Sequence, residues 1–147
     1  MNENKRRPRL IEFDYKGQYL YSITICVHDW RRIFEKGENY RLVFSVLREC
    51  ADKNEFDIHA YCFMPDHAHF LVQGKDDRSD LRRFIKGFKQ KSGFEFSKHH
   101  QEKLWQPSYY DHVLRKEEDF KAVALYRACR GIRFVIARRP KADVAIS

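Results

Sequence analysis

The chain has 147 residues, a mass of 17.8 kDa and a formal net charge of +8, from 29 Lys and Arg against 21 Asp and Glu. This length favours one domain over residues 1–147, and its short apolar runs exclude a membrane span of ~20 residues. Residues 1–9 are polar and basic and lack the apolar stretch of a secretory signal, so we expect a cytoplasmic protein.

The first half of the chain predicts a strand, a helix and a second strand. Residues Tyr19–Val27 are rich in β-branched and aromatic side chains, which is typical of a buried strand. From Asn39 to Asn54 the apolar residues recur at helical spacing, with Asn39 as a plausible N-cap. Residues Phe56–Phe63 again have the composition of a strand.

The second half predicts a hairpin, a basic helix, a strand and a last helix. Residues Met64–Asp66 indicate a tight turn, because proline cannot donate to a strand ladder, and His67–Gln73 follow as the third strand. Apolar residues at helical spacing begin at Leu81. Residues Tyr109–Arg115 predict a fourth strand, and acids at 117–119 favour the start of a third helix, which runs to about residue 129.

The order of these elements indicates the fold class. The series β-α-β-β-α-β with a C-terminal helix is the split βαβ, or ferredoxin-like, arrangement. We therefore expect an α+β fold, with an antiparallel sheet and its helices on one face. This architecture hosts many functions and does not by itself select one.

The positive charge is concentrated in three stretches. Residues 1–9 carry a net charge of +3, residues 81–91 contain five bases and no acid, and residues 127–147 contain six bases and one acid. Such stretches predict contact with a polyanion, with solvated surface as the alternative. Within the second stretch, four side chains are candidates for holding a DNA backbone: Arg82, Arg83, Lys86 and Lys89.

His67 and His69 are the most specific candidates for chemistry. Residues i and i+2 of a strand point to the same face, about 7 Å apart along the backbone, so two imidazoles there can converge on one ion. A His-x-His pair is also expected by chance in roughly a third of chains with this histidine content, so structural or surface histidines remain the alternative. The four cysteines have no spacing typical of zinc.

The segment around this pair carries a family resemblance. Residues 61–72, which include Met-Pro-Asp-His-Ala-His, resemble the HUH signature (His, bulky or apolar residue, His) of the single-tyrosine transposases, especially the REP-associated tyrosine transposases. The resemblance extends to residues 19–27, 81–91 and 104–115. It covers roughly residues 10–126 and so involves several motifs in the family's order.

The resemblance implies an activity and a set of site residues. It implies a DNA transposase that binds hairpin-forming single-stranded DNA and cleaves and rejoins it through a 5′-phosphotyrosine. The nucleophile would be Tyr126, and His67 and His69 would bind Mg²⁺ or Mn²⁺. Family members act as monomers or as homodimers, and both states remain open here.

One position departs from the family pattern. One turn past the tyrosine the family commonly has Asn or Gln, a possible third metal ligand, where this chain has Arg130. A guanidinium stays protonated and cannot bind a cation, although it can contact a phosphate. Residues 127–147 therefore form an atypical basic tail, and a catalytically degenerate single-stranded DNA-binding relative is the alternative function.

Two further polar residues lie near the predicted site. His112 is a possible third polar group beside the metal, and a hydrogen-bonded structural histidine is the more common case. Asp66 could orient His67 or close the hairpin turn with its own side chain, and the turn is favoured.

Overall fold

The computed structural model describes residues 13–114, 133–137 and 145–146. Its longer elements, in chain order, are β1 (Leu20–Cys26), α1 (Gly37–Lys53), β2 (Phe56–Met64), β3 (His67–Gly74), α2 (Leu81–His100), β4 (Tyr110–Leu114), β5 (Arg133–Ala137) and β6 (Ala145–Ile146). Two single turns of 3-10 helix, His28–Trp30 and Ile33–Glu35, connect β1 to α1. The helix predicted over residues 117–129 lies outside the described residues.

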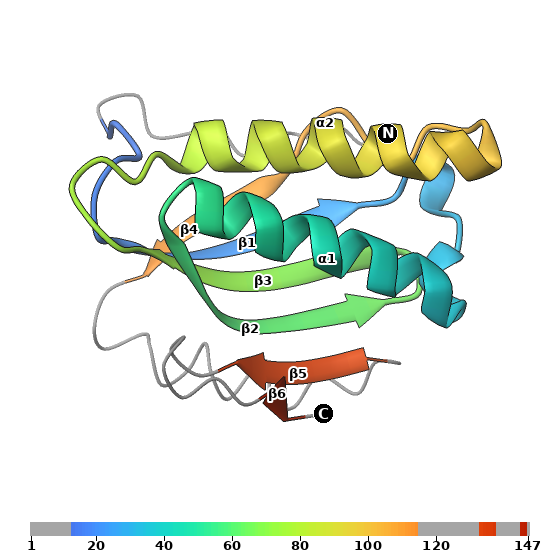
Figure 1. Cartoon of the computed structure of the whole chain (residues 1–147), viewed down its shortest axis with the longest axis horizontal. Coiled ribbons are helices and arrows are strands. Elements are labelled where there is room, and N and C mark those ends of the chain that lie inside the picture. Colours follow the sequence, from blue (N-terminus) through green and yellow to red (C-terminus); the bar gives the residue numbers. More distant parts are fainter. Residues whose placement is uncertain (1–12, 115–132, 138–144, 147) are drawn as a thin grey trace, which may run out of the picture.

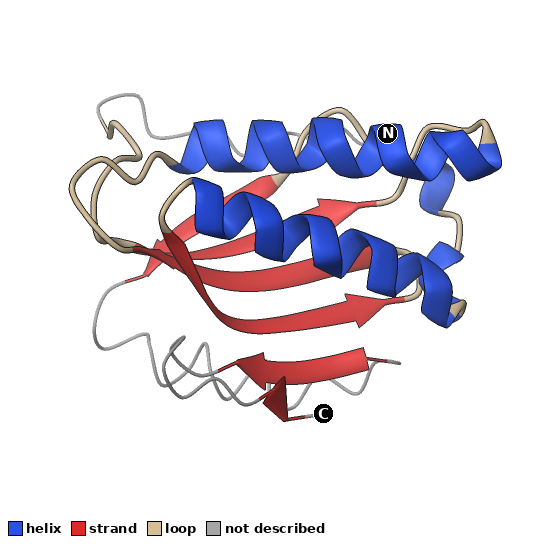
Figure 2. Cartoon of the chain, in the orientation of Figure 1, coloured by secondary structure: helices blue, strands red, loops and turns tan. Residues whose placement is uncertain are grey.

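The strands form one antiparallel sheet in the order β4-β1-β3-β2-β5-β6. Helices α1 and α2 lie side by side on one face of this sheet, as Figures 1 and 2 show. The first four strands in this order confirm the predicted ferredoxin-like α+β fold. Strands β5 and β6, which extend the sheet beyond β2, fall in the basic tail, where the sequence pattern predicts no element.

The core fills the space between the helices and the sheet. Alternate residues of β1 and β3, such as Ile23 and Phe70, point into it and are fully buried. Helix α2 contributes Phe84, which stacks on Phe56 at a centroid distance of 4.7 Å, and Phe88, which meets Phe70 edge-to-face at 5.6 Å. Burial of these aromatic rings fixes α2 on this layer, which we call the helix face of the sheet.

Both helices differ from their predicted bounds. Helix α1 begins at Gly37 with Lys36 as its N-cap, so the prediction that Asn39 caps this helix is wrong. Asn39 is buried one turn inside, and its side-chain amide donates to the Ile33 carbonyl at 2.8 Å. Helix α2 continues past the basic stretch to His100 and ends at Gln101, whose φ of 53° is left-handed. No helix in the described part of the chain has the length and apolarity to cross a membrane.

Candidate functional site

His67 and His69 open strand β3 on the face of the sheet opposite α1 and α2, which we call the histidine face. Their neighbour Ala68 and the next residue, Phe70, alternate with them and are buried in the core on the helix face. Across the ladder His67 pairs with Cys26 and His69 pairs with Thr24. The predicted common direction of the two histidines is therefore present in the structure.

A neighbouring side chain orients each imidazole. The Nδ1 atom of His67 lies 2.7 Å from Oδ1 of Asp66, and Nδ1 of His69 lies 2.9 Å from Oγ1 of Thr24. The two rings are perpendicular, with their centroids 4.7 Å apart. The preference for Asp66 as a turn-closing side chain is wrong, because its carboxylate binds the His67 ring instead.

The loop that carries Asp66 is fixed from two sides. The Val27 amide donates to the Asp66 carbonyl at 3.0 Å, and the Phe34 amide donates to the Pro65 carbonyl at 3.1 Å. The buried Phe34 ring meets Phe63 edge-to-face at 4.9 Å. Backbone bonds and core packing therefore determine where the histidine pair begins.

The electrostatic environment keeps His69 neutral. Burial, and to a smaller extent the neighbouring His67, lower the pKa of His69 from 6.5 to about 4. At neutral pH this ring therefore carries no charge. A neutral imidazole is the form that binds a metal ion.

The histidine pair has the chemistry of an incomplete metal site. Two oriented imidazoles supply two nitrogen donors, and the Asp66–His67 contact is the carboxylate–histidine arrangement that supports metal ligands in proteins. Among the residues that the structure describes, no three His, Cys, Asp or Glu side chains are grouped to hold an ion. The pair fits a divalent cation that receives its other ligands from elsewhere, including water or DNA oxygens.

His112 also lies on the histidine face, on a different strand from the pair. It is exposed on β4 and pairs with Ser22 of β1, whereas His69 pairs with Thr24 on the other side of β1. One full strand therefore separates His112 from the two imidazoles.

The four basic candidates on α2 have different surroundings. The Arg82 guanidinium lies 4.9 Å from the centre of the Tyr15 ring, while Arg83 and Lys86 are exposed, with no side-chain hydrogen bond or ion pair to another described residue. Lys89 is half-buried, and its ammonium donates to the carbonyls of Gln106 and Ser108 at 2.7 and 3.0 Å. Lys89 is thus placed as a clamp between α2 and the segment that leads into β4.

The basic part of α2 and the histidine pair lie on different faces and at different ends of the sheet. Asp80, which caps α2, forms a backbone β-bridge with Lys16 at the end of the sheet where β3 finishes. His67 begins β3 at the other end (Figure 1). At ~3.3 Å per residue, β3 separates these ends by about 20 Å. Arg82, Arg83 and Lys86 are therefore distant from the predicted metal ligands, whereas Lys89 bonds to Gln106, which in turn bonds to Cys26, the ladder partner of His67.

The remaining predicted site residues are on the C-terminal part of the chain. Tyr126 and Arg130 lie outside the described residues. Of the residues that the structure adds, Thr24 gives no local signal, because only the register of β1 against β3 brings it to His69. The clamp formed by Lys89 depends on a contact with residues 17 and 19 positions away, which helical periodicity does not reveal.

We compared the chain with known protein families and with curated proteins. The family model for IS200-like transposases matches residues 15–126, so the match ends one residue before the atypical tail. A search of curated proteins finds no match.

Two solved structures share the fold. One is a REP-associated tyrosine transposase bound to a REP hairpin, with a TM-score of 0.66, 17% identity and coverage of 82% of this chain and 70% of that chain. The other is a proposed transposase from Deinococcus radiodurans R1, with a TM-score of 0.58, 19% identity and coverage of 86% and 100%. With the family match over most of its length, the chain belongs to the IS200-like transposase family.

Proposed function

We propose that this protein binds hairpin-forming single-stranded DNA and cleaves and rejoins it, with Tyr126 as the nucleophile and with His67 and His69 as ligands of a divalent cation. The observation that carries the proposal is the paired imidazoles at the start of β3, each held by a hydrogen bond to its Nδ1. The family match, which ends at residue 126, includes both histidines and the tyrosine.

The proposed reaction is a transfer of one phosphodiester. The Tyr126 oxygen attacks the phosphorus as its phenol loses a proton, the bond to the 3′ oxygen breaks, and that oxygen takes up a proton. The DNA is then joined to the protein through a 5′-phosphotyrosine. Attack by the 3′-hydroxyl of another end reverses these steps, so strands are exchanged without a nucleotide cofactor.

His67 and His69 would hold the cation, which supplies charge stabilisation at the phosphoryl oxygens when bound. Imidazole nitrogens suit Mn²⁺ better than Mg²⁺, because Mg²⁺ prefers oxygen ligands and Mn²⁺ accepts both kinds. We therefore favour Mn²⁺ between the two. The contact with Asp66 and the bond to Thr24 use the Nδ1 atom of each ring and leave Nε2 as the atom that would bind the cation.

The exposed bases of α2 would hold the DNA backbone. Arg83 and Lys86 have no side-chain partner among the described residues and suit phosphate contacts, with Arg82 beside them. We assign Lys89 to the fixing of α2, because its ammonium is used within the protein. DNA that contacts both the basic side chains of α2 and the histidine pair must pass from one face of the sheet to the other.

A covalent adduct tests this proposal. Labelled hairpin DNA incubated with the protein and Mn²⁺ should give a protein–DNA adduct that survives denaturation. The adduct should be absent in Tyr126→Phe and strongly reduced in His67→Ala. Tyr110→Phe is the matched control, because Tyr110 is exposed on the histidine face and pairs with Thr24, next to His69.

The variants separate the alternatives. An adduct that persists in Tyr126→Phe and disappears in Tyr110→Phe would move the nucleophile to β4. DNA binding with no adduct in any metal would favour the degenerate binding relative, in which Arg130 replaces a ligand. Loss of DNA binding in the unmodified protein would overturn both readings.

A further inference from the structure

We propose that a hollow beside the C-terminal half of α2 binds an unpaired nucleobase of the single-stranded DNA. The hollow lies next to the end of the sheet where His67 begins β3. This inference rests on the proposed function, since it names a subsite for the same substrate. The hollow has a volume of about 730 Å³ and lies between α2 and residues 101–107. Small-ligand sites commonly measure ~300–1,000 Å³.

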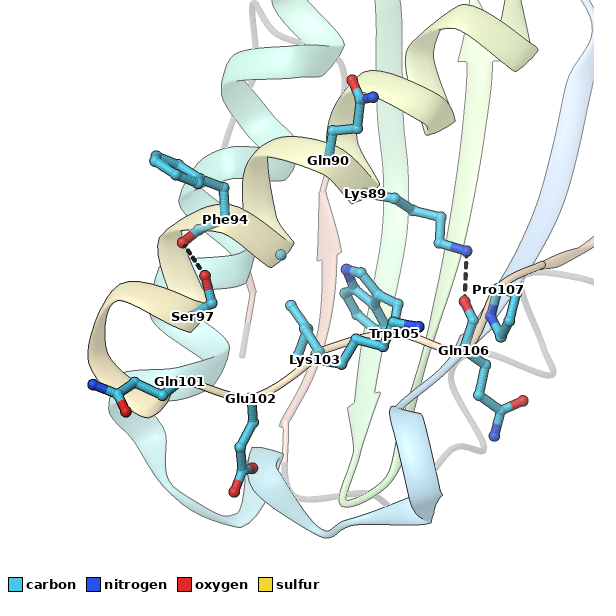
Figure 3. A pocket seen from close by; sticks show the side chains of 12 residues that line it. Lys89, Gln90, Phe94, Ser97, Gln101, Glu102, Lys103, Trp105, Gln106 and Pro107 are labelled. Atoms are coloured by element: carbon cyan, nitrogen blue, oxygen red, sulfur yellow. Dashed lines mark hydrogen bonds between the residues drawn. The ribbon is translucent and has the colours of Figure 1, made fainter.

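The hollow has an apolar floor and an exposed aromatic rim. Figure 3 shows the Trp105 ring between α2 and residues 101–107, with Lys89 reaching Gln106 beside it. Trp105 is held there because its indole nitrogen donates to the buried Ser92 hydroxyl at 2.9 Å. Leu104 adds a second buried apolar side chain.

Phe94 on the rim is unusual for this helix. The other phenylalanines of α2 are buried in the core, whereas the Phe94 side chain is 61% exposed and projects from α2 on the side away from Trp105 (Figure 3). Exposure of a whole phenyl ring to water is unfavourable, and a stacked base would cover it. Gly93 beside it leaves space, because a Cβ there would meet nothing within 4 Å.

The charges around the hollow suit a DNA strand. Glu102, which lines the hollow, is paired with Arg31, and Glu95, the residue after Phe94, is paired with Lys98. The Lys98 ammonium also lies 4.8 Å from the centre of the Phe94 ring. With its acids neutralised and Lys103 in its wall, the site attracts a phosphate backbone while the ring accepts a base.

The position of the hollow links it to the histidine pair. The backbone amide of Gln106 donates to the Cys26 carbonyl at 2.9 Å, and Cys26 is the ladder partner of His67. The hollow therefore lies at the end of the sheet where His67 begins β3, about 20 Å from the basic start of α2 by strand rise. A DNA strand that runs from the basic residues at the start of α2 toward the histidine pair meets this hollow before it passes around the end of β1.

Binding to matched oligonucleotides tests the inference. The probes are an oligothymidine and an abasic oligonucleotide of the same length, which share phosphates but differ in bases. The unmodified protein should bind oligothymidine about tenfold more tightly, as expected for one stacked base. Phe94→Ala and Gly93→Leu should lose most of this preference, the first by removing the ring and the second by filling the hollow.

Two controls keep the stacking surface and the backbone change separate. Phe94→Tyr keeps an aromatic ring and should keep the preference. Gly87→Leu makes the same change as Gly93→Leu elsewhere on α2, where a Cβ also meets open space, and should keep it too. In a Trp30→Phe background, quenching of Trp105 fluorescence by oligothymidine, and not by the abasic strand, would report occupancy directly.

The outcomes distinguish the two proposals. Unchanged preference in Phe94→Ala and Gly93→Leu, in a protein that still forms the covalent adduct, would overturn the base site and leave the proposed function standing. An equal loss on both probes would also overturn it, because the effect would then be on phosphate contact. A protein that binds neither probe but still forms the adduct with hairpin DNA would overturn the base site alone, and a protein that neither binds hairpin DNA nor forms the adduct would overturn both proposals.

Discussion

The two imidazoles of the histidine pair are oriented by side chains that never touch the DNA in our proposal. A metal-binding imidazole uses one nitrogen for the metal and the other for a hydrogen bond, and that second bond fixes the ring. Asp66 makes this bond to His67 from the preceding residue, and Thr24 makes it to His69 from the adjacent strand. The protein's own side chains thus fix the orientation of both rings.

Removal of either partner should weaken metal binding. In Asp66→Ala and in Thr24→Val we expect Mn²⁺ affinity to fall by about 10–100-fold, the usual effect of losing such a bond. Electron paramagnetic resonance of free Mn²⁺ measures this directly. Thr24→Ser keeps the hydroxyl and Asp77→Ala removes an exposed carboxylate, so both should bind normally. Normal affinity in Thr24→Val would mean that packing alone orients His69.

The lowered pKa of His69 predicts a loss of stability in acid. Its folded pKa of about 4 lies below the unfolded value of 6.5, so the unfolded chain binds a proton that the folded chain does not. The free energy of unfolding, in metal-free protein, should therefore fall as the pH drops from about 6.5 toward 4. The expected loss is on the order of 3 kcal/mol.

Urea titrations between pH 7 and pH 4 measure this loss. His69→Gln should flatten the pH dependence, whereas His99→Gln, at an exposed position near the end of α2, should leave it unchanged. An equally steep dependence in His69→Gln would assign the effect to other groups.

The sequence predicts the shared face of His67 and His69 and offers Asp66 as one alternative partner of His67, but it gives no sign of the partner of His69. The alternation of a strand needs only neighbouring residues, so it is visible in Met-Pro-Asp-His-Ala-His itself. Thr24 reaches His69 from 45 residues away, through the register of two strands. Register depends on the whole sheet and its turns, which local composition does not encode.

At the scale of elements, Gly74 marks a close approach between two chain segments. It ends β3, where its amide donates to the Tyr19 carbonyl at 3.1 Å. A Cβ at this position would lie 2.0 Å from the Gly17 carbonyl oxygen and 2.8 Å from Ser79. No side chain fits there unless the backbone moves.

Alanine should therefore have opposite effects at two glycines. Gly74→Ala should lower the free energy of unfolding by about 1–3 kcal/mol, as overpacking does. Gly87→Ala, inside α2 with open space around it, should raise it by about 0.5–1 kcal/mol, because glycine disfavours helix. Urea unfolding of both variants at neutral pH measures the difference. A neutral Gly74→Ala would show that the Gly17 turn shifts at little cost.

The elements most open to error in the sequence are those fixed by partners. Asn39 has the chemistry of an N-cap, but its side-chain amide donates to the Ile33 carbonyl and the N-cap is Lys36, three residues earlier. Strand β5 pairs with the far edge of β2, so its place in the sheet depends on an edge that local pattern does not show. Strands β1 to β3 and the cores of both helices follow periodicity and are predicted well.

At the scale of the molecule, the basic residues of α2 have two different roles: two are exposed for binding, and one stabilises the fold. Arg83 and Lys86 are exposed on the outer side of α2, whereas Lys89 ties this helix to Gln106 and Ser108 on the way to β4. All three are bases of one helix within seven residues. Only the first two are free to neutralise DNA phosphates in the structure.

Salt titration should separate these roles. If Arg83 and Lys86 each neutralise one phosphate of single-stranded DNA, the double variant Arg83→Gln, Lys86→Gln should reduce the slope of log affinity against log salt by roughly 1.4, because each released counterion contributes about 0.7. Its free energy of unfolding should stay unchanged. Lys89→Met should keep the slope and instead lower the free energy of unfolding by about 1–3 kcal/mol, since the carbonyls of Gln106 and Ser108 then lose their charged donor. Fluorescence anisotropy of a labelled oligonucleotide at several salt concentrations, with urea unfolding of the same samples, measures both quantities. A reduced slope in Lys89→Met with unchanged stability would show that this ammonium leaves its carbonyls for the DNA. The proposed phosphate-binding surface would then extend along α2 toward the end of the sheet where His67 begins β3.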